Sequence, residues 1–128
     1  MKDIDYSNHA FSNVINYNFI YADKTKHVWE LAKTESAYFL SRPRRFGKSL
    51  LLSTFAALFK GSPNPQQDPQ GLFKNLWISG KEANYDFNDT YPVISLSMSV
   101  SNEAPEMVTR SVQGDLRSVA ESYGLSLN

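Results

Sequence analysis

A short basic stretch with one glycine, one lysine and one serine is the part of the sequence best suited to chemistry. Arg44-Arg45-Phe46-Gly47-Lys48-Ser49 matches the second half of the phosphate-loop pattern, which is Gly, four residues, Gly-Lys and then Ser or Thr. Arg42 stands where the pattern has its first glycine, so the match is incomplete. Gly-Lys-Ser/Thr alone occurs by chance in about one sequence in twenty of this length. The motif therefore needs support from its surroundings.

The residue types in this loop are those that phosphate binding requires. The first N–H groups of a helix have no partner inside the helix and lie at the positive end of its dipole, so a phosphate can accept several of them. Gly47 lets the backbone approach closely and adopt a positive φ. Lys48 can bring a point charge to the phosphates, and Ser49 can ligate Mg²⁺, which prefers oxygen ligands. The forked guanidinium groups of Arg44 and Arg45 suit phosphate oxygens.

Two other interpretations of the same residues stay open. In the first, Gly47 is an ordinary loop glycine, Lys48 is exposed to solvent and Ser49 caps the following helix. In the second, the basic side chains of the loop, from Arg42 to Lys48, contact a nucleic-acid backbone, which predicts binding that weakens steeply with salt. Proteins of the second kind usually carry a longer basic stripe than this loop provides.

The elements around the loop are expected to place it between a strand and a helix. Hydrophobic patterning predicts helices over residues 24–33, 48–60 and 105–123, and strands over residues 37–40 and 91–100. Strands that alternate with helices predict an α/β fold with a parallel sheet, similar to P-loop NTPases. Two strands do not complete such a sheet, so we expect an incomplete parallel sheet with flanking helices. Its open edge favours self-association or a partner chain.

Composition excludes several kinds of site. Among 128 residues, 13 basic side chains balance 13 acidic ones, which gives no overall attraction to nucleic acid or to an anionic membrane. The absence of cysteine excludes disulfides, thiolate zinc sites and a cysteine nucleophile. His9 and His27 have no further ligand at metal-binding spacing. No apolar run has the length of a membrane span or a signal peptide, so we expect a cytoplasmic protein without a membrane partner.

Longer stretches of the sequence resemble a known family. They are Tyr21-Ala22-Asp23-Lys24-Thr25, the run Tyr38-Phe39-Leu40-Ser41-Arg42-Pro43-Arg44-Arg45-Phe46-Gly47-Lys48-Ser49-Leu50, and Tyr91-Pro92-Val93-Ile94-Ser95-Leu96. Together with Phe59-Lys60-Gly61 and Leu72-Phe73, they are similar to the predicted AAA-ATPase-like family of bacteria and archaea. The resemblance covers about residues 10–101. In that family the first glycine of the loop is also missing, so Arg42 does not argue against nucleotide binding.

The resemblance implies an ATP-binding module that uses Mg²⁺. Members are usually several hundred residues long, many carry a C-terminal nuclease-like domain of the PD-(D/E)XK type, and their acidic Walker B residues lie on a later strand. The strand expected over residues 91–100 is followed by Ser101-Asn102-Glu103, which does not match Walker B. We therefore expect residues 1–20 to be a lead-in, loosely ordered up to about residue 18, and residues 21–128 to be the N-terminal part of the P-loop domain, truncated before Walker B. Nucleic acid would be contacted through a nuclease-like domain that this chain lacks.

The resemblance also implies a set of site residues. The expected nucleotide-binding residues are Arg44, Arg45, Phe46, Gly47, Lys48, Ser49 and Leu50, and Ser49 is also the expected Mg²⁺ ligand. No catalytic residue is assigned, because Walker B helps to hold Mg²⁺ and to position the attacking water. A non-catalytic interaction or regulatory fragment with a vestigial loop stays open as the alternative. Asp23-Lys24-Thr25 either starts a helix, with Asp23 as its cap, or places Lys24 or Thr25 near the nucleotide.

Overall fold

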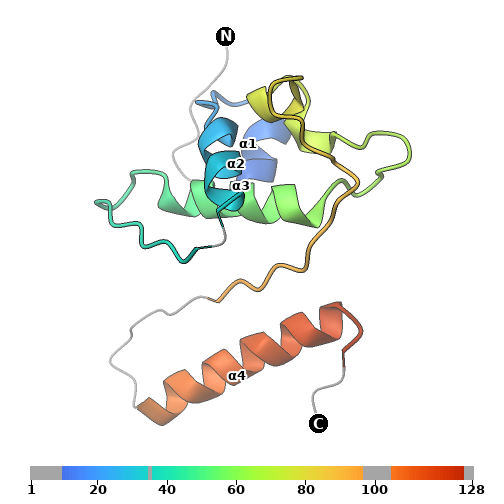
Figure 1. Cartoon of the computed structure of the whole chain (residues 1–128). Coiled ribbons are helices and arrows are strands. Elements are labelled where there is room, and N and C mark those ends of the chain that lie inside the picture. The colour runs from blue at the N-terminus through green and yellow to red at the C-terminus, as the bar shows by residue number, and fades with distance from the viewer. Residues whose placement is uncertain (1–9, 35, 97–104, 126–128) are drawn as a thin grey trace. The chain divides into compact units, whose positions relative to one another are not determined.

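The chain folds into two compact units, which meet between Tyr91 and Pro92 in the sequence. The computed structural model of the protein describes residues 10–34, 36–96 and 105–125. The helices are α1 Phe11–Asn16, α2 Thr25–Ala32, α3 Lys48–Lys60 and α4 Pro105–Ser122, and the 3-10 helices are η1 Gly71–Phe73 and η2 Trp77–Ser79. The first unit contains α1, α2 and α3, and the second contains α4 (Figure 1).

Helix α3 is the centre of the first unit, and both α1 and α2 pack against it (Figure 1). The core is made of completely or almost completely buried apolar side chains from all parts of the unit: Phe11, Val28, Leu58, Phe73, Ile78 and Ala83. The rings of Phe11 and Phe73 stack with their centroids 4.8 Å apart, which joins α1 to η1. Because η1 and η2 contribute to the same core, the chain after α3 is fixed against α2 and α3, the helices on either side of the basic loop.

Helix α1 lies in the stretch for which the sequence predicted only a loosely ordered lead-in. Phe11 is fully buried, and its N–H donates to the Ser53 hydroxyl over 2.8 Å. Burial of a phenylalanine side chain stabilises a fold by about 1.5–3 kcal/mol. The expectation of loose order is wrong from Phe11 onward. A helix of six residues is too short to show a hydrophobic period, so patterning had no means of detecting it.

The three longer helices confirm the sequence prediction. Helix α3 begins at Lys48 and ends at Lys60, and Gly61 follows with a φ of 74°. Helix α4 ends in the paired hydrogen bonds that a left-handed glycine allows. The Gly124 N–H donates to the Glu121 carbonyl and the Leu125 N–H to the Ala120 carbonyl, both over 2.9 Å, while Gly124 has a φ of 71°.

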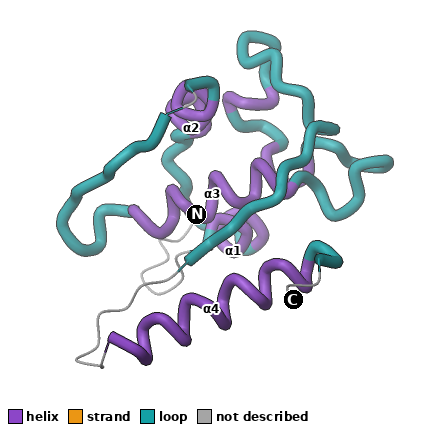
Figure 2. Tube along the Cα trace, turned by 60° about the horizontal axis from the view of Figure 1, so that its bottom comes forward, coloured by secondary structure: helices purple, strands orange, loops and turns teal. Residues whose placement is uncertain are grey.

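The expected α/β fold with a parallel sheet is wrong for the residues that the structure describes. Residues 37–40 and 91–96 run as irregular chain, and Figure 2 draws the described residues as helix or loop without a strand. The side chains of the first segment are exposed, with Phe39 94% accessible. A strand requires hydrogen bonds to a neighbouring strand, and an apolar run carries no information about such a neighbour. The argument for self-association from a sheet edge therefore loses its basis here.

The second unit consists of α4 and the chain segment that precedes it. The Val93 N–H donates to the Tyr123 hydroxyl over 2.7 Å, so residue 93 is joined to the end of α4. Ala120 is the buried apolar residue of this helix among those described. Of the strand predicted over residues 91–100, the structure describes residues 91–96. Residues 97–100 and the Ser101-Asn102-Glu103 stretch after them lie outside the described residues.

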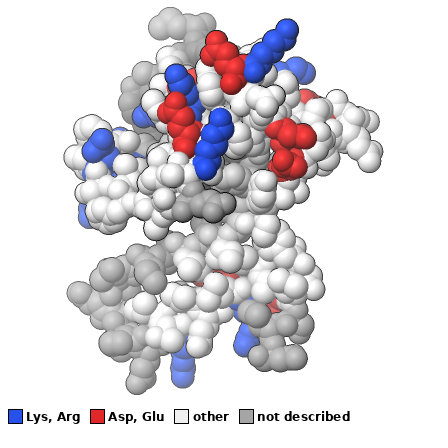
Figure 3. All heavy atoms as spheres, in the orientation of Figure 1, with Lys and Arg blue, Asp and Glu red and all other residues white. Residues whose placement is uncertain are grey.

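The surface of the described ranges carries charge of both signs. Figure 3 shows Lys and Arg side chains next to Asp and Glu on the visible face of the first unit, not a broad stripe of one sign. Within residues 10–34, 36–96 and 105–125, no helix combines the length and apolar character needed to cross a membrane. The basic loop before α3 is therefore a local feature.

Candidate functional site

The loop before α3 turns sharply through two residues with left-handed backbone. Arg45 has a φ of 65° and Gly47 a φ of 75°. A left-handed conformation costs a residue with a Cβ atom roughly 1–2 kcal/mol, whereas glycine adopts it freely. The loop thus accepts some strain at Arg45 and avoids it at Gly47, the residue that leads directly into the helix.

The N-terminus of α3 presents backbone donors to the space in front of it. Gly47 is the N-cap residue and makes no side-chain capping bond. The first bond of the helix runs from the Leu51 N–H to the Gly47 carbonyl over 2.9 Å. The N–H groups of residues 48–50 therefore have no partner within the helix. A Cβ atom at Gly47 would meet no other atom within 4 Å, which leaves this approach open to a ligand.

Lys48 bends back over the loop that precedes it. Its Nζ donates to the carbonyl oxygen of Arg42 and, over 3.2 Å, to that of Pro43. These contacts lie at the surface, and they hold the ammonium of the half-buried Lys48 residue against the loop that precedes α3. Because a phosphate oxygen is charged, it accepts a stronger hydrogen bond from an ammonium than a carbonyl oxygen does. Phosphate can therefore take the ammonium over from the loop carbonyls.

These residues surround an open cavity of about 220 Å³. Its lining consists of Arg44, Arg45, Gly47, Lys48, Ser49 and Leu50. The structure therefore brings together all of the expected site residues except Phe46, whose side chain is 65% exposed. Ser49 is exposed on the first turn of α3, where its hydroxyl can ligate a cation held by phosphate oxygens. Ser49 is the one hydroxyl side chain among the residues that line this cavity.

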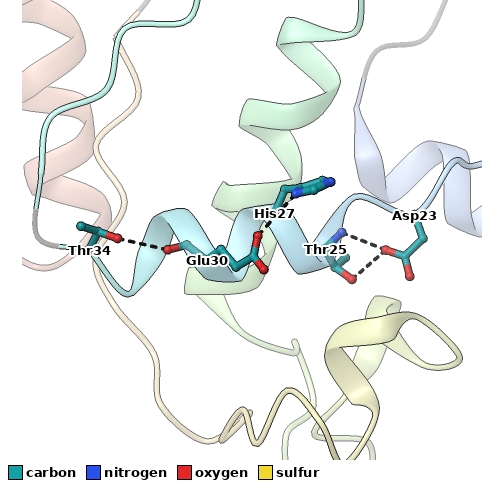
Figure 4. A network of polar contacts seen from close by, with 5 residues as sticks. All are labelled: Asp23, Thr25, His27, Glu30 and Thr34. Atoms are coloured by element: carbon teal, nitrogen blue, oxygen red, sulfur yellow. Dashed lines mark hydrogen bonds and ion pairs between the residues drawn. The ribbon is translucent and has the colours of Figure 1, made fainter.

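A second group of polar contacts fixes the start of α2, as Figure 4 shows. One oxygen of the Asp23 carboxylate accepts hydrogen bonds from the Thr25 N–H over 2.8 Å and from the Thr25 hydroxyl over 2.7 Å. The other oxygen accepts from the Trp77 N–H over 2.6 Å. The hydroxyl of Thr25, which is fully buried, accepts from the Ile78 N–H over 3.2 Å. Asp23 and Thr25 thus join the start of α2 to η2.

The hydrogen bonds from η2 to Asp23 and Thr25 are contacts that sequence reasoning missed. The sequence predicted that Asp23 starts a helix, and the bond to the Thr25 N–H agrees with that. Nothing in the sequence indicated partners more than fifty residues away. Between these two residues, Lys24 faces a cavity that Gly47 also lines. Burial raises the pKa of Tyr21, another residue of this cavity.

Helix α2 also carries an exposed histidine, His27, and a tryptophan, Trp29, that packs against the rest of the first unit. His27 is exposed and lies 3.5 Å from the carboxylate of Glu30, one turn further along the helix (Figure 4). The Trp29 indole N–H donates to the Ala83 carbonyl over 3.0 Å, and its ring packs edge-on against Tyr85. Among the described residues, no group of three or more histidine or acidic side chains is able to hold a metal ion by itself.

Fold and site together define a helical module with a basic loop at an uncapped helix N-terminus, an arrangement suited to anions. The chain belongs to the family described as Predicted AAA-ATPase, whose model matches residues 5–128. The resemblance noted in the sequence is thereby confirmed, over a longer range than the motifs alone covered.

Comparison with individual proteins adds one relative. A protein of Azotobacter chroococcum mcd 1, described as "Uncharacterized protein in vnfD 5'region", is 39% identical over 80 residues. The aligned part covers 62% of this chain and 14% of the relative, so the chain spans a small fraction of that protein's length. No solved structure matches.

Proposed function

We propose that this chain binds ATP together with Mg²⁺ through the loop Arg44–Ser49, as the nucleotide-binding part of a predicted AAA-ATPase. Membership of that family supports the choice of ATP. The observation that carries the proposal is the cavity at the start of α3, where Lys48, two arginines and free helix N–H groups converge. Each of these groups is a donor, and together they offer positive charge and directed hydrogen bonds to a polyphosphate.

In this arrangement the residues of the loop have separate roles. The N–H groups at the start of α3 donate to the phosphate oxygens, and Gly47 keeps their approach open. Lys48 exchanges its loop carbonyl partners for the β- and γ-phosphates. Arg44 and Arg45 neutralise the remaining charge at the rim, and Ser49 ligates Mg²⁺. Bound Mg²⁺ would supply positive charge that offsets the charge of the phosphates.

The proposal is limited to binding. Hydrolysis requires a group that positions the attacking water and helps to hold the metal. No residue of the described cavity is acidic, and the chain corresponds to only 14% of its relative from Azotobacter.

Calorimetric titration of the chain with Mg-ATP tests this function. The wild type is compared with Lys48→Ala and with Lys60→Ala, a control that removes an exposed lysine from the other end of the same helix. We expect Lys48→Ala to abolish measurable binding and Lys60→Ala to leave the Kd unchanged. Equal Kd values for all three proteins, or no binding by the wild type, would contradict the proposal. A steep fall of affinity for single-stranded DNA with salt, without ATP binding, would favour nucleic-acid contact instead.

A further inference from the structure

A second, smaller cavity lies beside the phosphate loop. Its volume is about 100 Å³. One wall comes from the chain before α2 and the other from the first two turns of α3, and the lining residues are Ile20, Tyr21, Ala22, Lys24, Gly47, Leu50, Leu51 and Thr54. Gly47 and Leu50 line this cavity and the phosphate cavity alike. The two cavities are thus neighbours that meet at the start of α3.

The volumes indicate why one cavity is insufficient for a nucleotide. Pockets that enclose a complete small ligand usually measure about 300–1,000 Å³. The phosphate cavity, at about 220 Å³, is smaller than this range and is lined by four polar or charged residues. Together the two cavities reach the lower end of the range. A ligand with a charged end and a separate uncharged end would use both.

The chemistry of the smaller cavity differs from that of the phosphate cavity. Aliphatic and aromatic side chains provide most of its lining, and none of the lining residues is acidic. Lys24 contributes one ammonium, which is a donor only. The Thr54 hydroxyl already donates to the Leu50 carbonyl over 2.8 Å. An apolar wall with one cationic donor suits a flat heteroaromatic ring with acceptor nitrogens at its edge.

The wall that carries Lys24 is held in place from both sides. Asp23 and Thr25 flank Lys24 in the sequence, and both are hydrogen-bonded to the backbone of η2. Thr25 is fully buried, so this part of the chain is tied to the core of the unit. Fixed walls favour binding because the ligand does not have to order them.

We propose that the smaller cavity takes the base of the nucleotide, with Lys24 donating to an acceptor on the base and with Asp23 and Thr25 as positioning residues. The inference rests on the proposed function, because the phosphates must occupy the neighbouring loop. It assigns a role to Asp23-Lys24-Thr25 that goes beyond starting a helix. ATP and inorganic tripolyphosphate share the phosphates and differ in the base. Changes in the smaller cavity should therefore weaken the binding of ATP and leave the binding of tripolyphosphate unchanged.

The first test fills the cavity. Ala22→Leu places a larger side chain in its lining, and Ala37→Leu is the matched control at an exposed alanine that lines neither cavity. We expect Ala22→Leu to weaken Mg-ATP binding about tenfold. The free-energy cost of overpacking is similar to the free energy that corresponds to a tenfold change in Kd. Its affinity for Mg-tripolyphosphate should be unchanged. Ala37→Leu should change neither, and thermal unfolding without ligand checks that both variants are folded.

The second test removes the donor. Lys24→Ala should weaken ATP binding several-fold and leave tripolyphosphate binding unchanged. Lys26→Ala is its control, since the Lys26 ammonium lies 5.9 Å above the Trp77 ring and lines neither cavity. Equal losses for ATP and tripolyphosphate would assign Lys24 to the phosphates and overturn the inference.

The remaining outcomes separate this inference from the proposed function. ATP binding that requires Lys48 but ignores both Ala22→Leu and Lys24→Ala would overturn the inference alone. A loss of both ligands in Ala22→Leu, with the fold intact, would have the same meaning. If the wild type binds neither ATP nor tripolyphosphate, the proposed function fails and this inference fails with it.

Discussion

Gly47 and Lys48 are adjacent in the sequence and contribute in different ways to the same site. Gly47 contributes conformation, because its φ of 75° is strained for any residue with a Cβ atom. Lys48 contributes a charge that the loop carbonyls already hold beside the helix. The lysine is thus partly ordered without a ligand, which would lower the entropy lost in the phosphate binding that we propose. Replacement of Gly47 should therefore strain the backbone of the loop, whereas replacement of Lys48 should remove a positive charge from it.

Asp23 is the residue whose replacement should show how firmly α2 is joined to η2. In Asp23→Asn, an amide NH₂ group replaces one of two oxygens that accept bonds from Thr25 and from the Trp77 N–H. We expect the free energy of unfolding of the first unit to fall by about 1 kcal/mol, since at least one of these donors loses its acceptor. Urea unfolding measures the change. Asp89→Asn, in an exposed loop, is the control, and an equal effect of both variants would contradict the prediction.

Tyr85 should make the stability of the first unit depend on pH in alkaline solution. Burial raises its pKa from 10.0 to about 12. Between these values the unfolded chain loses the phenolic proton while the folded chain keeps it, so the free energy of unfolding falls as the pH rises from about 10 to 12. Unfolding at several pH values should show a shallower decline for Tyr85→Phe than for the wild type. Tyr17→Phe, at a 68% exposed tyrosine, should decline as the wild type does; equal slopes for all three would refute this.

At the level of elements, helices could be predicted and strands could not. Helix α3 was predicted with both its ends because its signals are local: an apolar run, a glycine before it and a glycine after it. Residues 37–40 were predicted as a strand from apolar composition, yet Phe39 is 94% exposed. A strand is defined by hydrogen bonds to another segment, so its existence depends on residues outside the pattern. The short α1 was missed because its six residues are too few to show a hydrophobic period, although the helix buries Phe11.

Two glycines should respond in opposite ways to the same replacement. Gly47→Ala forces a Cβ atom into left-handed backbone and should destabilise the first unit by about 1 kcal/mol. Gly114 lies inside α4 and has open space around it, so Gly114→Ala should stabilise that helix by about 0.5–1 kcal/mol. Circular dichroism during thermal unfolding measures both changes. Because a Cβ atom meets open space at both positions, the two variants differ in backbone conformation, and a change of the same sign in both would contradict the prediction.

At the level of the whole molecule, the sequence located half of the proposed site. The phosphate loop is one continuous stretch, so its lining could be predicted from residues 44–50. The smaller cavity combines the chain before α2 with two turns of α3, and the hydrogen bonds that fix it run from Asp23 and Thr25 to η2. Such contacts arise only when distant segments share a core. No local pattern contains them, which explains why the role of Asp23-Lys24-Thr25 was left open.

The measurement that tests the account most directly is thermal unfolding with and without Mg-ATP, on the wild type and on Lys48→Ala in parallel. A ligand at 100 times its Kd adds about 2.7 kcal/mol of apparent stability. We expect a shift of the unfolding midpoint in the wild type that is absent from Lys48→Ala, with equal midpoints for the two proteins without ligand. An equal shift in both proteins, or no shift in the wild type at saturating Mg-ATP, would contradict a phosphate site at the start of α3.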